Sequence, residues 1–128
     1  MLDPVPSDWE AIQQEIQAVL LDTGVDGFFT TSVENSRFED LYVQGTWDSE
    51  ESVWLEISLP EDASEDSADE LIAHGWNSPT DEIPNFWKEL PWDAEDSATV
   101  AAHFIQAILV FGLAADDCEL ITNIETEK

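Results

Sequence analysis

The sequence predicts an α+β fold, a two-layer sandwich in which helices pack on one face of an antiparallel sheet. The middle of the chain alternates apolar and polar residues with period two, which is typical of strands with one buried face. Apolar residues near both ends instead recur every three or four positions, which is typical of helices. Short polar connections between the strands favour antiparallel neighbours. The expected order is α-β-β-β-α-(β)-α, and we expect residues 1–128 to form a single domain.

The first expected element is a helix over residues 8–22. Its apolar face consists of Trp9, Ile12, Ile16, Val19 and Leu20. Ser7 followed by Glu10 matches a capping box, in which the two side chains bond free amides at the helix start. Gly24 suits the left-handed conformation that often ends a helix.

Three strands are expected next, over residues 28–33, 38–47 and 52–59. Turn residues at 35–36 and 48–51 separate them. Alternation places these side chains towards the core: Leu41, Val43, Trp47, Val53, Leu55, Ile57 and Leu59. It places these on the opposite face: Tyr42, Gln44, Thr46, Trp54, Glu56 and Ser58.

An acidic loop that includes Asp62 should follow, and then a short helix capped by Ser67 with Glu70 and ending at Gly75. Residues 76–92, WNSPTDEIPNFWKELPW, form a connector that prolines stiffen. Its indole rings either anchor the segment across the core or line a groove for an amphipathic or basic peptide, and both hold if Trp76 is buried while Trp87 and Trp92 are exposed. Within it, residues 85–87 can pair with a sheet edge until Pro91 ends the pairing.

The last long helix begins among the carboxylates and caps of residues 93–97 and extends to about Leu113. This helix is apolar on nearly all sides, so we expect it to be buried on all sides. We also expect a homodimer whose contact is made either by this helix or by the face that bears Trp54. Polar residues interrupt this segment and acids flank it, which favours a buried helix over a membrane span. Residues 119–123 can add a short strand.

The charge is extreme, since three basic residues stand against thirty acids for a net charge of −27. A solvated acidic surface, adaptation to a salty cell and mimicry of nucleic acid would each account for it. A field of this sign repels phosphates and anionic lipids, so we expect no direct nucleic-acid or membrane binding and a preference for basic partners. The single cysteine, Cys118, cannot form an internal disulfide. A reducing cytoplasm is therefore the expected location, and no signal peptide is visible.

Residues for catalysis are few. His74 and His103 are the only histidines, and neither has a companion at metal-binding spacing. The glycines are scattered, without a phosphate-binding loop, and no cofactor is expected. Catalysis would require at least two of His74, His103 and Cys118 to meet in one cleft.

Several segments together resemble a known family. Residues 71–76 (LIAHGW), Pro79, residues 84–87 (PNFW) and an alanine-rich helix ending in Phe111-Gly112 are similar to an actinobacterial family related to YbjN and to type III secretion chaperones. The resemblance implies a small, acidic, dimeric, chaperone-like fold that holds an extended segment of a partner. It also implies that residues near Trp87 add a strand beside the meander, and it carries over no active site.

The main functional hypothesis is therefore a non-enzymatic protein-binding module. Its partner would be a basic or amphipathic segment held by apolar anchoring on Tyr42, Trp54, Trp87 and Trp92, with carboxylates steering the approach. The alternative is an acidic mimic that occupies a nucleic-acid-binding protein, which requires carboxylates spaced along one face like phosphates.

Overall fold

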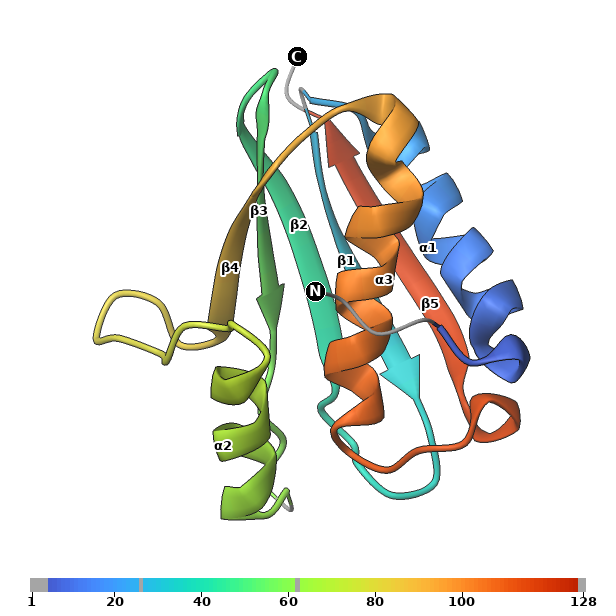
Figure 1. Ribbon diagram of the computed structural model, residues 1–128, viewed down its shortest axis with the longest axis vertical. Coiled ribbons are helices and arrows are strands. Elements are labelled where there is room, and N and C mark those ends of the chain that lie inside the picture. Colours follow the sequence, from blue (N-terminus) through green and yellow to red (C-terminus); the bar gives the residue numbers. More distant parts are fainter. Residues whose placement is uncertain (1–4, 26, 62, 127–128) are drawn as a thin grey trace.

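The computed structural model describes residues 5–25, 27–61 and 63–126 and confirms an α+β fold, with one antiparallel sheet and helices on one of its faces (Figure 1). The strands are hydrogen-bonded in the order β4-β3-β2-β1-β5. Their bounds are β1 (Gly27–Glu34), β2 (Tyr42–Ser49), β3 (Ser52–Ile57), β4 (Phe86–Pro91) and β5 (Glu119–Thr126). The helices are α1 (Glu10–Thr23), α2 (Glu65–Ala73) and α3 (Ser97–Leu109), with the 3-10 turns η1 (Ser7–Trp9), η2 (Ala94–Asp96) and η3 (Ala115–Asp117).

The predicted meander of β1, β2 and β3 is confirmed, but β2 begins at Tyr42 rather than at Phe38. The Asn35 side chain explains the later start. Its Oδ1 accepts hydrogen bonds from the amides of Arg37 and Phe38, at 2.9 and 2.7 Å, and so forms a turn that keeps this segment out of the ladder.

The third strand is also shorter than predicted, because it ends at Ile57 rather than at Leu59. The Ser58 hydroxyl donates to the Asp40 carbonyl at 2.7 Å and accepts from the Tyr42 amide at 2.9 Å, which closes the end of the sheet. Ser58 is therefore buried and Leu59 is 40 % exposed, the reverse of the predicted arrangement.

Both strands that the sequence left optional are present, one on each edge of the sheet. β4 pairs with β3 from Ile57↔Phe86 to Ser52↔Pro91, as the connector pattern suggested. β5 pairs with β1 along its whole length and is longer than the predicted 119–123. The chain therefore returns from the helices twice, and each return extends the meander by one strand.

Two predicted helix caps are wrong. A single 3-10 turn, η1, precedes α1, and neither Ser7 nor Glu10 forms the expected capping box, since no side-chain cap bond is present at either start. α2 begins at Glu65 with Ser64 as its cap residue, so Ser67 lies buried inside the helix instead of capping it. Asp62, assigned to the acidic loop before α2, lies outside the described residues.

The helices form the second layer, with α3 over the middle of the sheet, α1 beside it towards β5, and α2 near the end of β3 and β4 (Figure 1). Gln13 and Gln17 of α1 donate to the start of α3, at Ala98 O and Ser97 Oγ. α3 ends at Leu109, four residues before the predicted end.

Neighbours within one chain cover most of α3, which removes the packing argument for a dimer through this helix. None of the helices in the described ranges has the length and apolar character that crossing a bilayer requires.

Candidate functional site: the open face of the sheet

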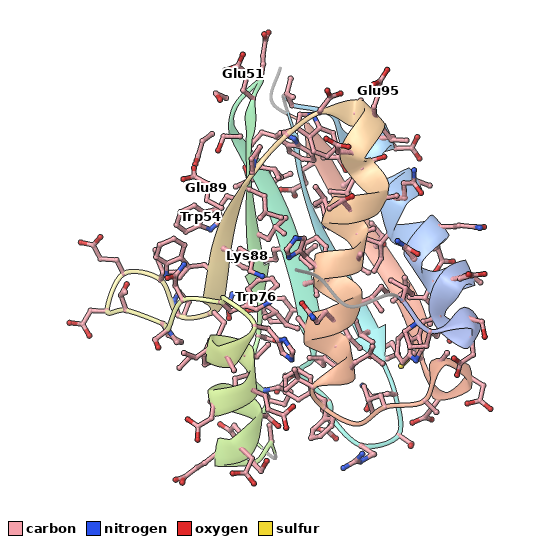
Figure 2. The ribbon with its side chains drawn as sticks, viewed as in Figure 1. Glu51, Trp54, Trp76, Lys88, Glu89 and Glu95 are labelled. Carbon is pink, nitrogen blue, oxygen red and sulfur yellow. The ribbon has the colours of Figure 1, made fainter. Side chains whose placement is uncertain are left out.

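The sheet face opposite the helices, here called the open face, bears the alternate side chains of the strands. No helix of the described residues lies over it (Figure 1). Strand register gives it these aromatic and aliphatic side chains: Phe28, Tyr42, Trp54, Trp87 and Ile121. Figure 2 shows Trp54 and Glu89 on the left of β4, and Lys88 and Trp76 on its right, towards α3.

Two stacked indole rings lie on the open face near its β4 edge. Trp54 of β3 and Trp87 of β4 are stacked, with ring centroids 4.5 Å apart and planes 6° from parallel. Their strands pair directly, with Trp54 opposite Glu89 and Trp87 opposite Glu56, so the backbone ladder places the two tryptophans diagonally on the same face, within stacking reach. Stacked rings of this kind present a rigid apolar surface at a low cost in side-chain entropy.

A chain of hydrogen bonds leads away from the stack, from Trp54 through Glu56 and Asn85 to Tyr42. Trp54 Nε1 donates to Glu56 Oε2 at 3.0 Å, and Asn85 Nδ2 donates to Glu56 Oε1, also at 3.0 Å. The Tyr42 hydroxyl donates to Asn85 Oδ1 at 3.2 Å. Each Glu56 oxygen has a second lone pair available, so this carboxylate is held in place but keeps its charge and part of its acceptor capacity.

A hollow of about 270 Å³ lies beside the stack, and we call it the Phe28–Trp54 slot. It is lined by Phe28, Phe29, Gln44, Gly45, Thr46, Trp54 and Glu56. Phe28 and Trp54 both pair with Thr46 of β2, from opposite sides, so the two rings stand two strands apart. That is a backbone separation of about 10 Å, which leaves room for one flat group between them.

Further carboxyl groups stand beside Trp54. Glu89 pairs with Trp54 across β3 and β4 and accepts a hydrogen bond from the Ser52 hydroxyl at 3.0 Å. A hydrogen bond with Glu89 is the main cause that raises the pKa of Asp48, and the same bond lowers the pKa of Glu89. Negative charge is therefore crowded at this end of the open face.

The structure brings together three of the four residues expected to contact a partner. Tyr42, Trp54 and Trp87 share the open face and its hydrogen-bond network. Trp92 lies apart, because its ring packs edge-on against the core residue Trp47 with centroids 5.2 Å apart. Sequence reasoning missed Phe28 and Asn85. Phe28 alternates with the buried Phe29, and that signal could have placed it on the open face.

A second polar cluster lies between the sheet and the helices. The Lys88 side chain, 7 % exposed, points to the covered side of β4. Its Nζ donates to the His74 carbonyl at 3.0 Å, lies 3.1 Å from His103 Nδ1 and sits 4.9 Å from the centre of the Trp76 ring. Burial lowers the pKa of Lys88. Burial, followed by the charge of Lys88, lowers the pKa of His103 to about 4.

Cys118 is far from this cluster. It directly precedes β5, at the opposite edge of the sheet from β4, which is about 19 Å away at four strand spacings. Burial and then the charges of Asp117 and Asp116 raise its pKa, so the thiol is protonated and a weak nucleophile. Among the described residues, no hydrogen bond joins Cys118 to either histidine, whereas the His74 carbonyl and His103 Nδ1 both contact Lys88 Nζ.

Within the described ranges, no group of three or more histidine, cysteine or acidic side chains is placed to hold a metal ion. No protein-family model, curated protein or solved structure matches the chain. The geometry of the open face is therefore the basis for a functional proposal.

Proposed function

We propose that this protein is a non-enzymatic, chaperone-like module that holds an extended segment of a protein partner on its open face. The observation that carries the proposal is a sheet face that no helix of the described residues covers and that bears the stacked Trp54–Trp87 pair near its β4 edge. Rigid aromatic surfaces surrounded by polar groups are typical of protein-binding hot spots. The resemblance to YbjN-related proteins and type III secretion chaperones supports the same class of function.

The distribution of charge favours this proposal over acidic mimicry. A mimic of nucleic acid needs carboxylates in rows along one face, whereas exposed acids here occur on all sides, for example Glu15 on α1, Glu70 on α2 and Glu95 in η2. Figure 2 likewise shows carboxylates around the whole outline. Such a spread keeps the chain soluble and selects against acidic partners.

The test is suppression of the aggregation of a chemically unfolded reporter protein, a standard measure of segment holding. A variant with Trp54→Ser and Trp87→Ser should lose most of the protective effect, because it loses the apolar surface. The matched control is Leu21→Ser with Ile72→Ser, which removes two side chains that are each 48 % exposed on α1 and α2. Equal loss in both variants, or protection that survives without the tryptophans, would contradict the proposal.

A further inference from the structure

We propose that the Phe28–Trp54 slot takes an arginine side chain of the partner segment, so that the open face selects segments with an arginine among apolar residues. This inference depends on the proposed function and specifies its partner. It starts from the two walls of the slot, which are aromatic, and from its polar end, where Gln44 and Glu56 stand opposite each other.

The polar end of the slot favours a cation over an apolar or anionic group. Both donors on Glu56, the Trp54 indole and the Asn85 amide, are neutral, so they hold the carboxylate without cancelling its charge. An apolar group pressed against Glu56 would strip its water and offer no new donor, which costs free energy. An anion would be repelled by Glu56, by Glu89 and by a chain of net charge −27.

The aromatic walls favour arginine over lysine. A guanidinium group is flat, stacks on aromatic rings and offers donors in a fork that matches a carboxylate. The phenyl ring of Phe28, 40 % exposed, and the indole of Trp54 stand on the two sides that such a group would contact. The aliphatic part of the side chain would cross Thr46 towards the sheet surface.

The chain's own described cations are engaged elsewhere. Arg37 Nη1 donates to the carbonyls of Phe111 and Gly112 at 3.3 Å, and its guanidinium lies 5.2 Å from the centre of the Phe38 ring. Lys88 is on the other side of the sheet. Neither fills the slot, and an external arginine meets no competing cation from the described residues.

A second copy of the chain is a poorer occupant than a basic segment. Two open faces placed together would bring Glu56, Glu89 and Asp48 of both copies into one interface, where like charges repel. A basic segment instead gains attraction from the same groups, and its binding should weaken as salt increases.

The experiment compares three short peptides of alternating leucine and serine that carry arginine, lysine or uncharged citrulline at the central position. Binding is followed by the backbone and indole N–H signals in heteronuclear NMR spectra. We expect the arginine peptide to bind about tenfold more tightly than the citrulline peptide, with the largest shifts at Trp54 and Phe28.

Two variants locate the effect. Glu56→Gln and Phe28→Leu should each remove most of the arginine preference. The control is Glu34→Gln, which removes a charge from the same face at the far end of β1, about 20 Å from Phe28. Thermal unfolding of each variant checks that the fold is retained.

The outcomes separate the two proposals. Equal binding of all three peptides with shifts at Trp54 and Trp87 would overturn the arginine inference and leave the binding module standing. Tighter binding of the lysine peptide would also overturn the inference, since the slot would then recognise a compact ammonium group. Absence of shifts with every peptide, or sedimentation showing that a second copy covers the face, would overturn both.

Discussion

Acidification should destabilise this protein through one residue, His103. Its pKa is 6.5 in an unfolded chain and about 4 in the folded protein, because the ring is buried beside the Lys88 ammonium. Between these values the unfolded state binds the proton more tightly than the native state does. The stabilisation from neutral His103 is therefore complete above pH 6.5 and is lost as the pH falls towards 4.

The magnitude follows from the two pKa values. Between pH 8 and pH 5 the linkage relation gives a loss of about 2 kcal/mol in the free energy of unfolding, or about 1–2 kcal/mol after allowing for the partial exposure of the ring. Stopping at pH 5 keeps the protein above its isoelectric point of about 4.1, where it would tend to precipitate.

The assay is urea unfolding at several pH values for the wild type and for His103→Asn. Asparagine does not titrate, and its side-chain oxygen can still accept from Lys88 Nζ. The titration of the carboxylates and of Lys88 is common to both proteins and cancels in the comparison. The wild type should lose the stated free energy relative to the variant as the pH falls from 8 to 5. Parallel stability curves would refute the burial of His103 beside a cation.

Three further predictions concern packing and charge. In a double-mutant cycle with Trp54→Leu and Trp87→Leu, urea unfolding should give a coupling of about 0.5–1.5 kcal/mol from the stacked rings, and a coupling of zero would contradict the geometry. Gly45→Ala should cost about 1–3 kcal/mol, because the added Cβ would collide with Cε1 of the Phe29 ring and lie 2.8 Å from Cζ. Adding Phe29→Leu should recover part of that loss, and additive losses would show that the clash is not the cause. Raising NaCl to about 0.5 M should raise the melting temperature by screening the net charge of −27, and a melting temperature independent of salt would argue against self-repulsion.

The sequence predicted the fold class because its strands have one covered face, and period-two alternation reports such burial directly. Val53, Leu55 and Ile57 are fully buried as expected. The predicted strand boundaries were wrong where a side chain bonds to the backbone, as Asn35 and Ser58 do. Such bonds replace the hydrogen bonds between strands but leave the hydrophobic pattern of the sequence unchanged, so the pattern does not reveal them.

The candidate site was predictable only in part. The alternation of apolar and polar residues places Trp54 and Tyr42 on the same face of the sheet. The pattern within one strand does not, however, show which other strand is its neighbour. The order β4-β3-β2-β1-β5 supplies this information, since it brings Trp87 onto Trp54 and sets Phe28 across the slot. Trp92 follows Trp87 by only five residues but lies beyond the end of β4, where the chain crosses to the core and its ring meets Trp47.

Lys88 shows why charge counts alone mislead in this chain. One of only three basic residues is buried, with a helix-terminal carbonyl, a neutral imidazole and the face of Trp76 as its partners. The negative end of the α2 dipole and the aromatic ring both favour an ammonium there. The connector over residues 76–92 is therefore held by a cation as well as by indoles.

This arrangement also separates charge across the sheet. The ammonium of Lys88 lies on the covered side of β4, while the neighbouring residue Glu89 and the cross-strand Glu56 project from the open face. Only a cation on the open face could neutralise these carboxylates, and the side chain of Lys88 points to the covered side instead. No cation of the described residues therefore compensates the negative charge beside the stacked indoles, and a basic, partly apolar segment complements such a surface better than an acidic one does.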